Sequence, residues 1–582
     1  MQILTNHIGY HTASAKRMIL QCSEVLAPNF PAPSAQLIDQ DSGSVLRTLQ
    51  VTSSGSVPGW KDRHFYLFDF SDFTGKGVFR FEVTAGNAQI HGLPFTIGDE
   101  LLQDSCISDI LFYFKGQRSS GRWDLADRSA SFFGERSDRV DVHGGWYDAA
   151  GDYSKYLSHL SYANYLNPQQ IPLVVWSLYS LGEILASRPR HRGTLLVERA
   201  LEEGAWGADF LVRMLDPEGY FYMTLFDQWN KKSDARMICA FKTKQGERLE
   251  EYQAGFRQGG GMAIAALARA ARFPRTEIPS DGFDCDAYRQ TAERGYDHLL
   301  RHNCEYLDNG RENIIDYYCA LLASVELFTT TKDASYLEGA RSWACKLSSL
   351  FFDEKKCWFA ESGNSRPFFH ASDSGMPIIS LLRYAEVEDN PSMKAETLAL
   401  VERACRAELS LASEVHNPFG LARQKVRAVG GKDHSSFFVP HENESGYWWQ
   451  GENARLASLA CAMRQAATAL APGGVSEGLL EQMKAFATAQ LDWILGFNPF
   501  DTCMLAGRGR NNPRFESFYP NAPGGICNGI TAGFFDESDI DFLPKTAIEQ
   551  GDHRWRWSEQ WIPHGAWFLM ALAAEMADGG DQ

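Results

Sequence analysis

Long apolar runs are missing from this chain of 582 residues. No stretch approaches the roughly 18 consecutive apolar residues that a membrane-spanning helix needs. Residues 1–7 show neither the basic segment nor the apolar segment of a secretory signal. We therefore expect a cytoplasmic protein that has no membrane partner.

Several sequence motifs are also missing. None of the 12 cysteines lies in a C-x-x-C pair, which argues against a zinc knuckle and favours free, mostly buried thiols. The chain lacks a P-loop, an H-E-x-x-H motif and a Rossmann fingerprint after a strand, and its G-x-S-x-G match at residues 474–478 lies between two helical segments instead of after a strand. These observations argue against serine-hydrolase, nucleotide-binding and zinc-peptidase chemistry. We expect no cofactor and no metal in the reaction.

Basic residues are outnumbered, with 56 Lys and Arg against 73 Asp and Glu, for a net charge of −17. This balance repels a phosphate backbone, so nucleic acid is a poor partner. Aromatic residues, by contrast, are abundant at 13%, and they include 15 tryptophans. Their rings could stack on the apolar C–H faces of sugars, or they could simply fill a large core.

Short apolar runs separated by turn signals occupy residues 1–98. In one run Phe79, Phe81 and Val83 alternate with Arg80 and Glu82, which is the period of a half-buried strand. Several short strands within about 100 residues predict a small β-sandwich domain.

Residues 99–582 show a different pattern. Leu337, Ala340, Ala344 and Leu347 recur at helical spacing, and about a dozen segments of this kind follow one another. Between them lie long loops rich in Gly, Pro, Asn and Trp, which are usually functional at such lengths. We expect a second, mainly α domain, in which helical hairpins close into a barrel and the long loops form a cleft at one end.

Two aspartates lie in the run H-G-G-W-Y-D-A-A-G-D-Y, residues 143–153. Asp148 and Asp152 could together hold and deprotonate one water, as a general base for hydrolysis must. Trp146 and Tyr147 are candidate substrate-binding rings, and the glycines permit close approach of a ligand. The same run also fits an Asx-turn, a helix N-cap or a calcium loop.

A second segment, residues 437–453, alternates stacking rings with hydrogen-bonding groups, as a sugar subsite requires. Its candidate substrate-binding residues are His441, Glu442, Glu444, Trp448 and Trp449. Glu442 and Glu444 are also candidate acids. The alternative is a helix N-terminus with ordinary capping and buried tryptophans.

Glu559 lies among tryptophans in the third segment, W-R-W-S-E-Q-W, residues 555–561. A poorly solvated pocket raises the pKa of a carboxyl group and retains its proton, as a general acid needs. Trp555 and Trp561 are candidate substrate-binding rings. Glu559 also fits a helix N-terminus, where negative charge is favourable, and the two interpretations are compatible.

Together these segments resemble glycoside hydrolase family 9. The resemblance rests on the run around Asp148 and Asp152, on L-G-F-N-P at residues 495–499, and on N-H-I-G-Y at residues 6–10. It implies an (α/α)6 barrel behind an immunoglobulin-like domain, and hydrolysis with inversion. It also implies that Asp152 is the base, that Asp148 helps to hold the water and that Glu559 is the acid. Inversion requires opposed carboxyl groups roughly 6.5–9.5 Å apart.

The chain departs from the family pattern in two places. Its D-A-A-G-D is one residue longer than the usual D-A-G-D, so the placement of the two aspartates should differ. N-P-R-F-E-S, residues 512–517, stands in place of a P-H-H-R-like sugar-binding stretch, which indicates a different leaving subsite. The lengthened D-A-A-G-D motif, residues 155–166 and residues 440–453 resemble the cytoplasmic exo-β-D-glucosaminidases, which remove glucosamine from the non-reducing end of chitin-derived oligosaccharides.

The alternative substrate is a cello-oligosaccharide, cleaved by a cellodextrinase, β-glucosidase or endoglucanase of the same family. A carboxylate near C2 would favour cationic glucosamine over glucose, and the candidates are Asp148, Asp433, Glu442 and Glu444. A non-catalytic sugar-binding protein would need a broken Asp/Asp/Glu set. A polysaccharide lyase would need uronate-binding arginines, for which the candidates are Arg508, Arg510 and Arg514.

Overall fold

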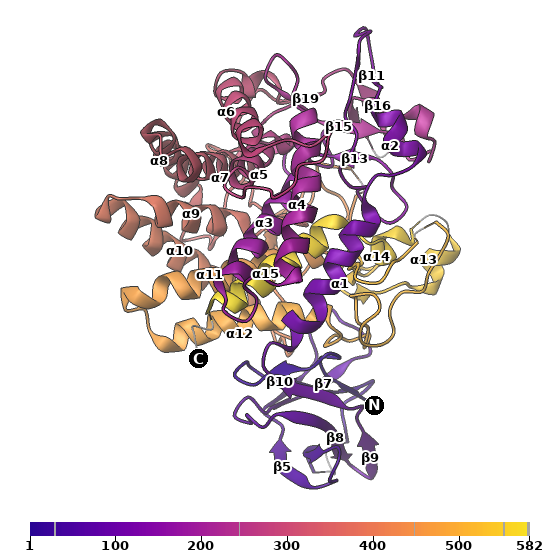
Figure 1. Ribbon diagram of the computed structural model, residues 1–582. Helices are drawn as coiled ribbons and strands as arrows, with labels where there is room; N and C mark the ends of the chain where they lie inside the picture. The colour runs from indigo at the N-terminus through magenta and orange to yellow at the C-terminus, as the bar shows by residue number, and fades with distance from the viewer. Residues whose placement is uncertain (28–30, 244, 447, 519, 551–552, 579–582) are drawn as a thin grey trace.

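The computed structural model describes residues 1–27, 31–243, 245–446, 448–518, 520–550 and 553–578, and it places a small β domain beside a larger helical domain (Figure 1). The last strand of the β domain, β10, ends at Gly98, and the first helix, α1, begins at Leu101. Within these described ranges, no helix combines the length and the apolar composition needed to cross a membrane.

The β domain is a sandwich of two sheets, as expected. One sheet has the strand order β1-β3-β7-β6, and the other has the order β2-β10-β8-β4-β5 with β9 paired to β8. Phe79, Phe81 and Val83 lie on β8 and pack into the core between the sheets. The strands are β1 Gln2–Leu4, β2 Tyr10–His11, β3 Arg17–Cys22, β4 Ser34–Asp39, β5 Val45–Gln50, β6 Ser53–Gly55, β7 His64–Asp69, β8 Gly77–Ala85, β9 Ala88–His91 and β10 Phe95–Gly98.

The helical domain is an (α/α)6 barrel. Within the described residues, its inner ring runs α3-α5-α7-α9-α11-α15, and α15 packs back against α3 to close the ring. The inner helices are α3 Ile171–Ser187, α5 Gly261–Ala270, α7 Ile314–Thr331, α9 Met376–Val387, α11 Asn453–Leu470 and α15 Ile562–Asp578. The outer helices are α1 Leu101–Gln117, α4 Leu195–Arg213, α6 Cys285–His302, α8 Ala334–Ser348, α10 Pro391–Ala412 and α12 Glu477–Ile494.

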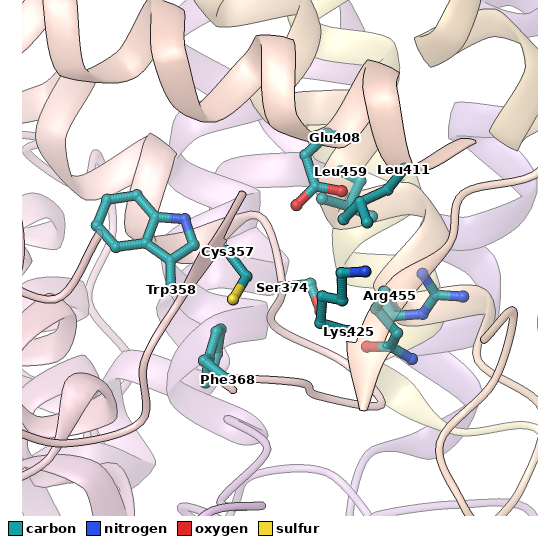
Figure 2. Close-up of a pocket in the computed structure, with 10 residues that line it drawn as sticks. Cys357, Trp358, Phe368, Ser374, Glu408, Leu411, Lys425, Arg455 and Leu459 are labelled. Carbon is teal, nitrogen blue, oxygen red and sulfur yellow. The ribbon is translucent and has the colours of Figure 1, made fainter. Parts of the chain in front are cut away.

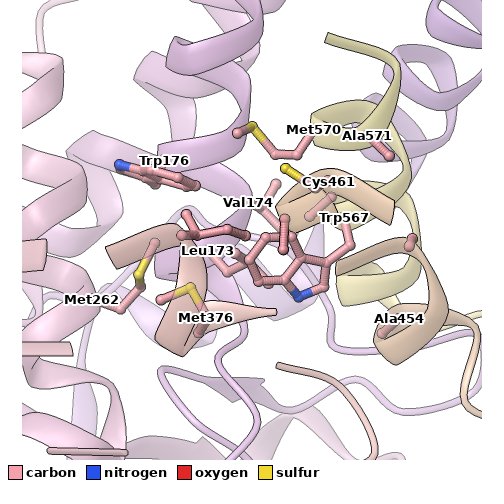
Figure 3. Packing of buried hydrophobic residues seen from close by; sticks show 14 of the residues in the cluster. Leu173, Val174, Trp176, Met262, Met376, Ala454, Cys461, Trp567, Met570 and Ala571 are labelled. Carbon is pink, nitrogen blue, oxygen red and sulfur yellow. The ribbon is translucent and has the colours of Figure 1, made fainter. Parts of the chain in front are cut away.

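The inner helices are apolar on nearly every side because they contact both the barrel axis and the outer helices. Figure 3 shows the result: Leu173 and Val174 of α3, Met262 of α5 and Cys461 of α11 pack around the indole of Trp567 from α15. The predicted fold class is therefore confirmed.

The connections between helices differ at the two ends of the barrel. Each link from an inner helix to the next outer helix is comparatively short: residues 188–194, 271–284, 332–333, 388–390 and 471–476. The links that lead into inner helices include the far longer stretches 118–170, 214–260, 413–452 and 495–561. The long loops therefore gather where the inner helices begin, and all three predicted site segments lie there.

These loops carry short elements of their own. Their largest sheet has the order β12-β11-β16-β15-β13 and appears beside α2 in Figure 1. The elements are α2 Arg122–Asp127, β11 Ala130–Phe132, β12 Arg139–Val140, β13 Lys155–Tyr156, β14 Phe221–Tyr222, β15 Thr224–Phe226, β16 Met237–Ile238, β17 Ala240–Lys242, β18 Glu247–Leu249, β19 Gln253–Ala254, β20 Phe351–Phe352, β21 Cys357–Trp358, β22 Gln424–Val426, β23 His434–Ser436, β24 Thr531–Ala532, β25 Ile540–Asp541, α13 Lys545–Glu549 and α14 Trp555–Ser558.

Two of the family-like motifs meet at the joint between the domains. The Asn6 side chain donates to Asp492 of α12 at 2.7 Å, and the backbone N–H of His7 donates to the Leu495 carbonyl at 2.9 Å. Gly496 has a φ of 110°, and a Cβ there would lie 2.4 Å from the His7 ring. The N-x-x-G-Y and L-G-x-N-P motifs therefore hold the sandwich on the barrel.

A buried ion cluster ties four inner helices together. The fully buried Glu326 of α7 accepts hydrogen bonds from Arg269 of α5 at 2.8 Å and from Trp176 of α3 at 3.0 Å. Arg383 of α9 lies 3.5 Å from the same carboxylate. The three guanidinium groups of Arg269, Arg383 and Arg272 lower the pKa of Glu326 to about 2, although its burial alone would raise it.

Glu326→Ala should lower the free energy of unfolding by roughly 3–5 kcal/mol, because it leaves buried arginines without a counter-ion. Chemical denaturation at neutral pH measures this loss. The pKa is depressed in the folded state, so the stabilisation is present above the unfolded pKa near 4.5 and is lost only as the pH falls toward about 2. The matched control is Glu386→Ala, which removes an exposed partner of Arg383 and should cost less than about 1 kcal/mol. Equal losses in the two variants would contradict a central role for Glu326.

Candidate active site

A tight turn presents Asp148 and Asp152 on the same side of the loop before α3. The Asp152 N–H donates to the Ala149 carbonyl at 3.2 Å, and Gly151 supplies a φ of 101°. Oxygen atoms of the two carboxylates lie within 4.8 Å of each other. The turn therefore accommodates the extra alanine of D-A-A-G-D, and the two carboxylates still lie close together.

Asp152 is buried and held at both oxygens. Its Oδ1 accepts from the Ser154 N–H at 2.8 Å, and its Oδ2 accepts from the Tyr156 hydroxyl at 2.9 Å and the Trp229 indole at 3.1 Å. Burial raises the pKa of Asp152 to about 6, while the hydrogen bonds from Ser154 and Tyr156 oppose that rise.

Asp148 is equally buried, and one donor serves both of its oxygens. The Trp561 indole N–H lies 3.1 Å from Oδ1 and 3.1 Å from Oδ2. Burial raises the pKa of Asp148 well above its usual range, and the negative charges of Asp152 and Glu559 raise it further. The two neighbouring carboxylates therefore oppose each other's ionisation.

Glu559 connects α14 to α15 and is half-buried. Its loop is hydrogen-bonded directly to the aspartate loop: the Ala150 N–H donates to the Gln560 carbonyl at 2.7 Å, and the Ile562 N–H donates to the Asp148 carbonyl at 3.1 Å. The negative charge of Glu559 also raises the pKa of Asp148, which places its carboxylate near that aspartate. The structure thus brings together all three carboxylates that the sequence singled out.

His159 is a further member of the site that the sequence analysis did not single out. One of its ring nitrogens lies within 4.8 Å of both aspartate carboxylates, and neither nitrogen has a hydrogen-bond partner in the part of the chain that the structure describes. The rings of Tyr156 and Phe241 pack against it. Burial lowers the pKa of His159 to about 3, so the ring is neutral and one nitrogen can accept a hydrogen bond.

Trp229 was missed as well, because it lies 77 positions from Asp152 and outside every motif. Nothing in its local sequence separates it from the other tryptophans. The sequence contained only a weak indication that His159 and Tyr156 belong to the site, because both lie in the 155–166 run that resembles the glucosaminidase branch.

Two predicted substrate-binding rings are buried. Trp146 is fully buried and donates to Glu203 of α4 at 2.8 Å, so it packs the barrel wall. Trp449 is 1% exposed and belongs to an apolar cluster with Trp448 and Trp557. Both rings fill volume between loops and helices, and their contacts with a sugar stay predictions.

The other predicted subsite residues differ in exposure. Trp448 and Tyr147 are almost buried, Trp555 is half-buried, and Trp561 is buried with its N–H on Asp148. His441 stacks on Trp449 with ring centroids 3.7 Å apart. Their contacts with substrate remain predictions.

The carboxylates outside the central group have their own partners. Glu444 pairs with Arg366, with Nη2 and Oε2 at 2.8 Å, and Asp433 pairs with Arg427 at 2.5 Å. Glu442 is exposed. These positions favour Glu559 over Glu442 and Glu444 as the acid.

The loop arginines considered for a lyase are used mainly in packing. Arg508 pairs with Asp109 at 2.5 Å, and Arg510 pairs with Asp501 at 2.6 Å beside the domain joint. A uronate-binding set of arginines is therefore not supported.

The pocket in Figure 2 is separate from the three carboxylates. Glu408 of α10, Arg455 of α11 and Lys425 of β22 line it, together with Cys357 and Trp358. Its volume of about 20 Å³ holds little more than one water and cannot admit a sugar ring.

Comparisons with known proteins agree with this architecture. A family model described as Glycosyl hydrolase family 9 matches residues 104–516, and one described as Cellulase N-terminal ig-like domain matches residues 1–88. Glu559 lies beyond the first match, so its place in the site rests on its contact with the aspartate loop.

Three comparisons extend over nearly the whole chain. A cellodextrinase of Butyrivibrio fibrisolvens is 23% identical over 575 residues, which cover 92% of this chain and 91% of that protein. The crystal structure of a metagenome-derived glycoside hydrolase family 9 endoglucanase superposes with a TM-score of 0.64 at 17% identity, and covers 99% of both chains.

A Bacteroides ovatus GH9 structure gives a TM-score of 0.65 at 17% identity and covers 99% of this chain and 98% of its own. At this identity the two solved structures show the fold, while the family match, over more than half of the chain, shows the family. With its immunoglobulin-like domain, six-hairpin barrel and converging carboxylates, this chain belongs to glycoside hydrolase family 9.

Proposed function

We propose that this hydrolase removes β-1,4-linked glucosamine from the non-reducing end of chitosan- or chitin-derived oligosaccharides, with inversion at the anomeric carbon. Asp152 acts as the base, Asp148 helps to hold the water, and Glu559 protonates the leaving oxygen. The pKa of Asp152, at about 6, suits a base that must be ionised near neutral pH, whereas the pKa of Asp148 is raised more strongly.

The observation that carries the choice of sugar is uncompensated negative charge. Asp148 and Asp152 lie together, and no Lys or Arg of the described residues donates to either aspartate. Uncompensated buried carboxylates are unfavourable, and a cation bound among them would relieve that cost. A substrate that carries an ammonium group supplies such a cation.

The arrangement of acceptors also suits an ammonium group. Its three N–H donors need three acceptors on one side, and Asp148, Asp152 and neutral His159 offer three acceptor atoms within 4.8 Å of one another. The same donor atoms could hold a divalent metal ion. Glucosamine carries its ammonium at C2, next to the anomeric carbon that the water must attack.

The second candidate function is that of a cellodextrinase, which removes glucose units from cello-oligosaccharides. It is favoured by the relative of that name, which matches this chain over almost its full length. The two functions share the carboxylate mechanism and differ in the group at C2.

Glu559→Gln should reduce kcat on unactivated oligosaccharides by roughly 10²–10⁴, because glutamine fills the same space but has no acidic proton to transfer to the leaving oxygen. An aryl glycoside with a good leaving group should lose much less, because its departure needs little protonation. Binding of the oligosaccharide, measured by calorimetry, should change little. Retention of full activity on unactivated oligosaccharides would show that the acid lies elsewhere.

The substrate prediction compares three disaccharides at neutral pH. The glucosamine dimer should be cleaved with a kcat/KM at least roughly 10² above that of cellobiose, because only its C2 ammonium satisfies the converging acceptors. The N,N′-diacetylated dimer has a neutral nitrogen and is the matched control for charge, so it should be a poor substrate. If cellobiose equals or exceeds the glucosamine dimer, the cellodextrinase function replaces the one proposed.

A further inference from the structure

Asp227 is a fully buried carboxylate that belongs to none of the sequence motifs. It follows directly after β15, the strand that pairs with β13 beside the aspartate loop. It lies close enough to Asp152 for its negative charge to raise the pKa of that group.

Two residues bridge Asp227 and Asp152, and each touches both carboxylates. Ser154 donates its backbone N–H to Asp152 at 2.8 Å and its hydroxyl to Asp227 at 2.9 Å. Trp229 donates its indole N–H to Asp152 at 3.1 Å and its backbone N–H to Asp227 at 2.9 Å. The two bridges run in parallel between a buried anchor and the proposed base.

The bridge through Trp229 needs an anchor because its backbone is unusual. Trp229 has a φ of 56° and its neighbour Gln228 a φ of 59°, in the left-handed region that bulky residues rarely adopt. Asp227 also accepts from the Lys231 N–H at 2.9 Å, so it caps the backbone on the far side of this turn. Its carboxylate therefore stabilises the turn that aims the indole at Asp152.

We propose that Asp227 is a positioning residue for Asp152: through Ser154 and Trp229 it fixes the direction in which Asp152 faces the substrate, and it places a second negative charge behind it. This inference rests on the proposed function, in which Asp152 is the base. Asp227 itself touches neither the substrate nor the reacting water.

The hydrogen-bond bridges and the charge of Asp227 shift the pKa of Asp152 in opposite directions. The charge of Asp227 disfavours ionised Asp152 and raises its pKa, whereas the N–H and O–H donors favour the ionised form and lower it. The other titratable groups that face Asp152 are Asp148, Tyr156 and His159, and the first titrates together with it.

The test is the pH dependence of kcat/KM for the full-length protein on its best oligosaccharide. Activity falls on the acid side as the base takes up its proton. Asp227→Asn removes a negative charge, so the acid limb should move down by about one pH unit. Trp229→Phe removes only the donor to ionised Asp152, so its acid limb should move up. Both variants should also lose roughly tenfold or more in kcat, because the carboxylate is no longer held in place.

The acid limb is expected to move down in Asp227→Asn and up in Trp229→Phe. A merely structural role would lower the activity of both variants without moving the acid limb. Asp234→Asn, which removes an exposed charge from the same loop, is the matched control and should leave the profile in place. Should Asp227→Asn fail to fold, the upward shift in Trp229→Phe still decides the matter. Shifts of the same sign, or no shift in folded variants, would overturn the proposal.

Asp152→Asn distinguishes this inference from the proposed function. If Asp152→Asn keeps its activity, then Asp152 is not the base and both proposals fall. If Asp152→Asn is inactive and the acid limb of Asp227→Asn does not move, only the role of Asp227 is wrong.

Discussion

Closure of the inner ring by α15 against α3 is the constraint on which the site depends. Asp148 and Trp561 are 413 positions apart, yet the indole of one contacts the carboxylate of the other because these two helices are neighbours. Backbone hydrogen bonds between the loops before α3 and α15 then fix Glu559 against the aspartate pair. Any change that loosens this closure separates the proposed acid from the proposed base.

Buried negative charge is the second organising feature, and the carboxylates of the two sites have different kinds of hydrogen-bond donors. The carboxylate of Glu326 is neutralised by arginines from neighbouring inner helices, and its pKa is lowered to about 2. Asp148 and Asp152 receive only uncharged donors, and their pKa values are raised. The first arrangement stabilises the barrel, whereas the second leaves charge that a bound cation or a proton must balance.

Much of the fold could be predicted from the chain alone because its signals are local. Alternation along residues 79–83 identifies a strand, and helical periodicity such as that around Leu337–Ser348 repeats often enough to indicate a barrel. Asp148, Asp152 and Glu559 could be named as candidates because short motifs around them resemble those of the family. Burial could not be predicted residue by residue: Trp146 and Trp449 look like sugar-stacking rings in sequence, but they fill the interior because helices and loops from distant segments cover them.

The sequence by itself determined the two-part architecture, because strand and helix periodicity are local. Its resemblance to glycoside hydrolase family 9 singled out Asp148, Asp152 and Glu559 as the candidate carboxylates. Only the tertiary structure decided what surrounds them. Trp229, His159 and Asp227 reach the aspartates through β-strand pairing and turns whose partners lie far away in the chain. The raised pKa values of Asp148 and Asp152 likewise come from the folded structure, because a pKa depends on burial and on neighbouring charges, which exist only once the chain is folded.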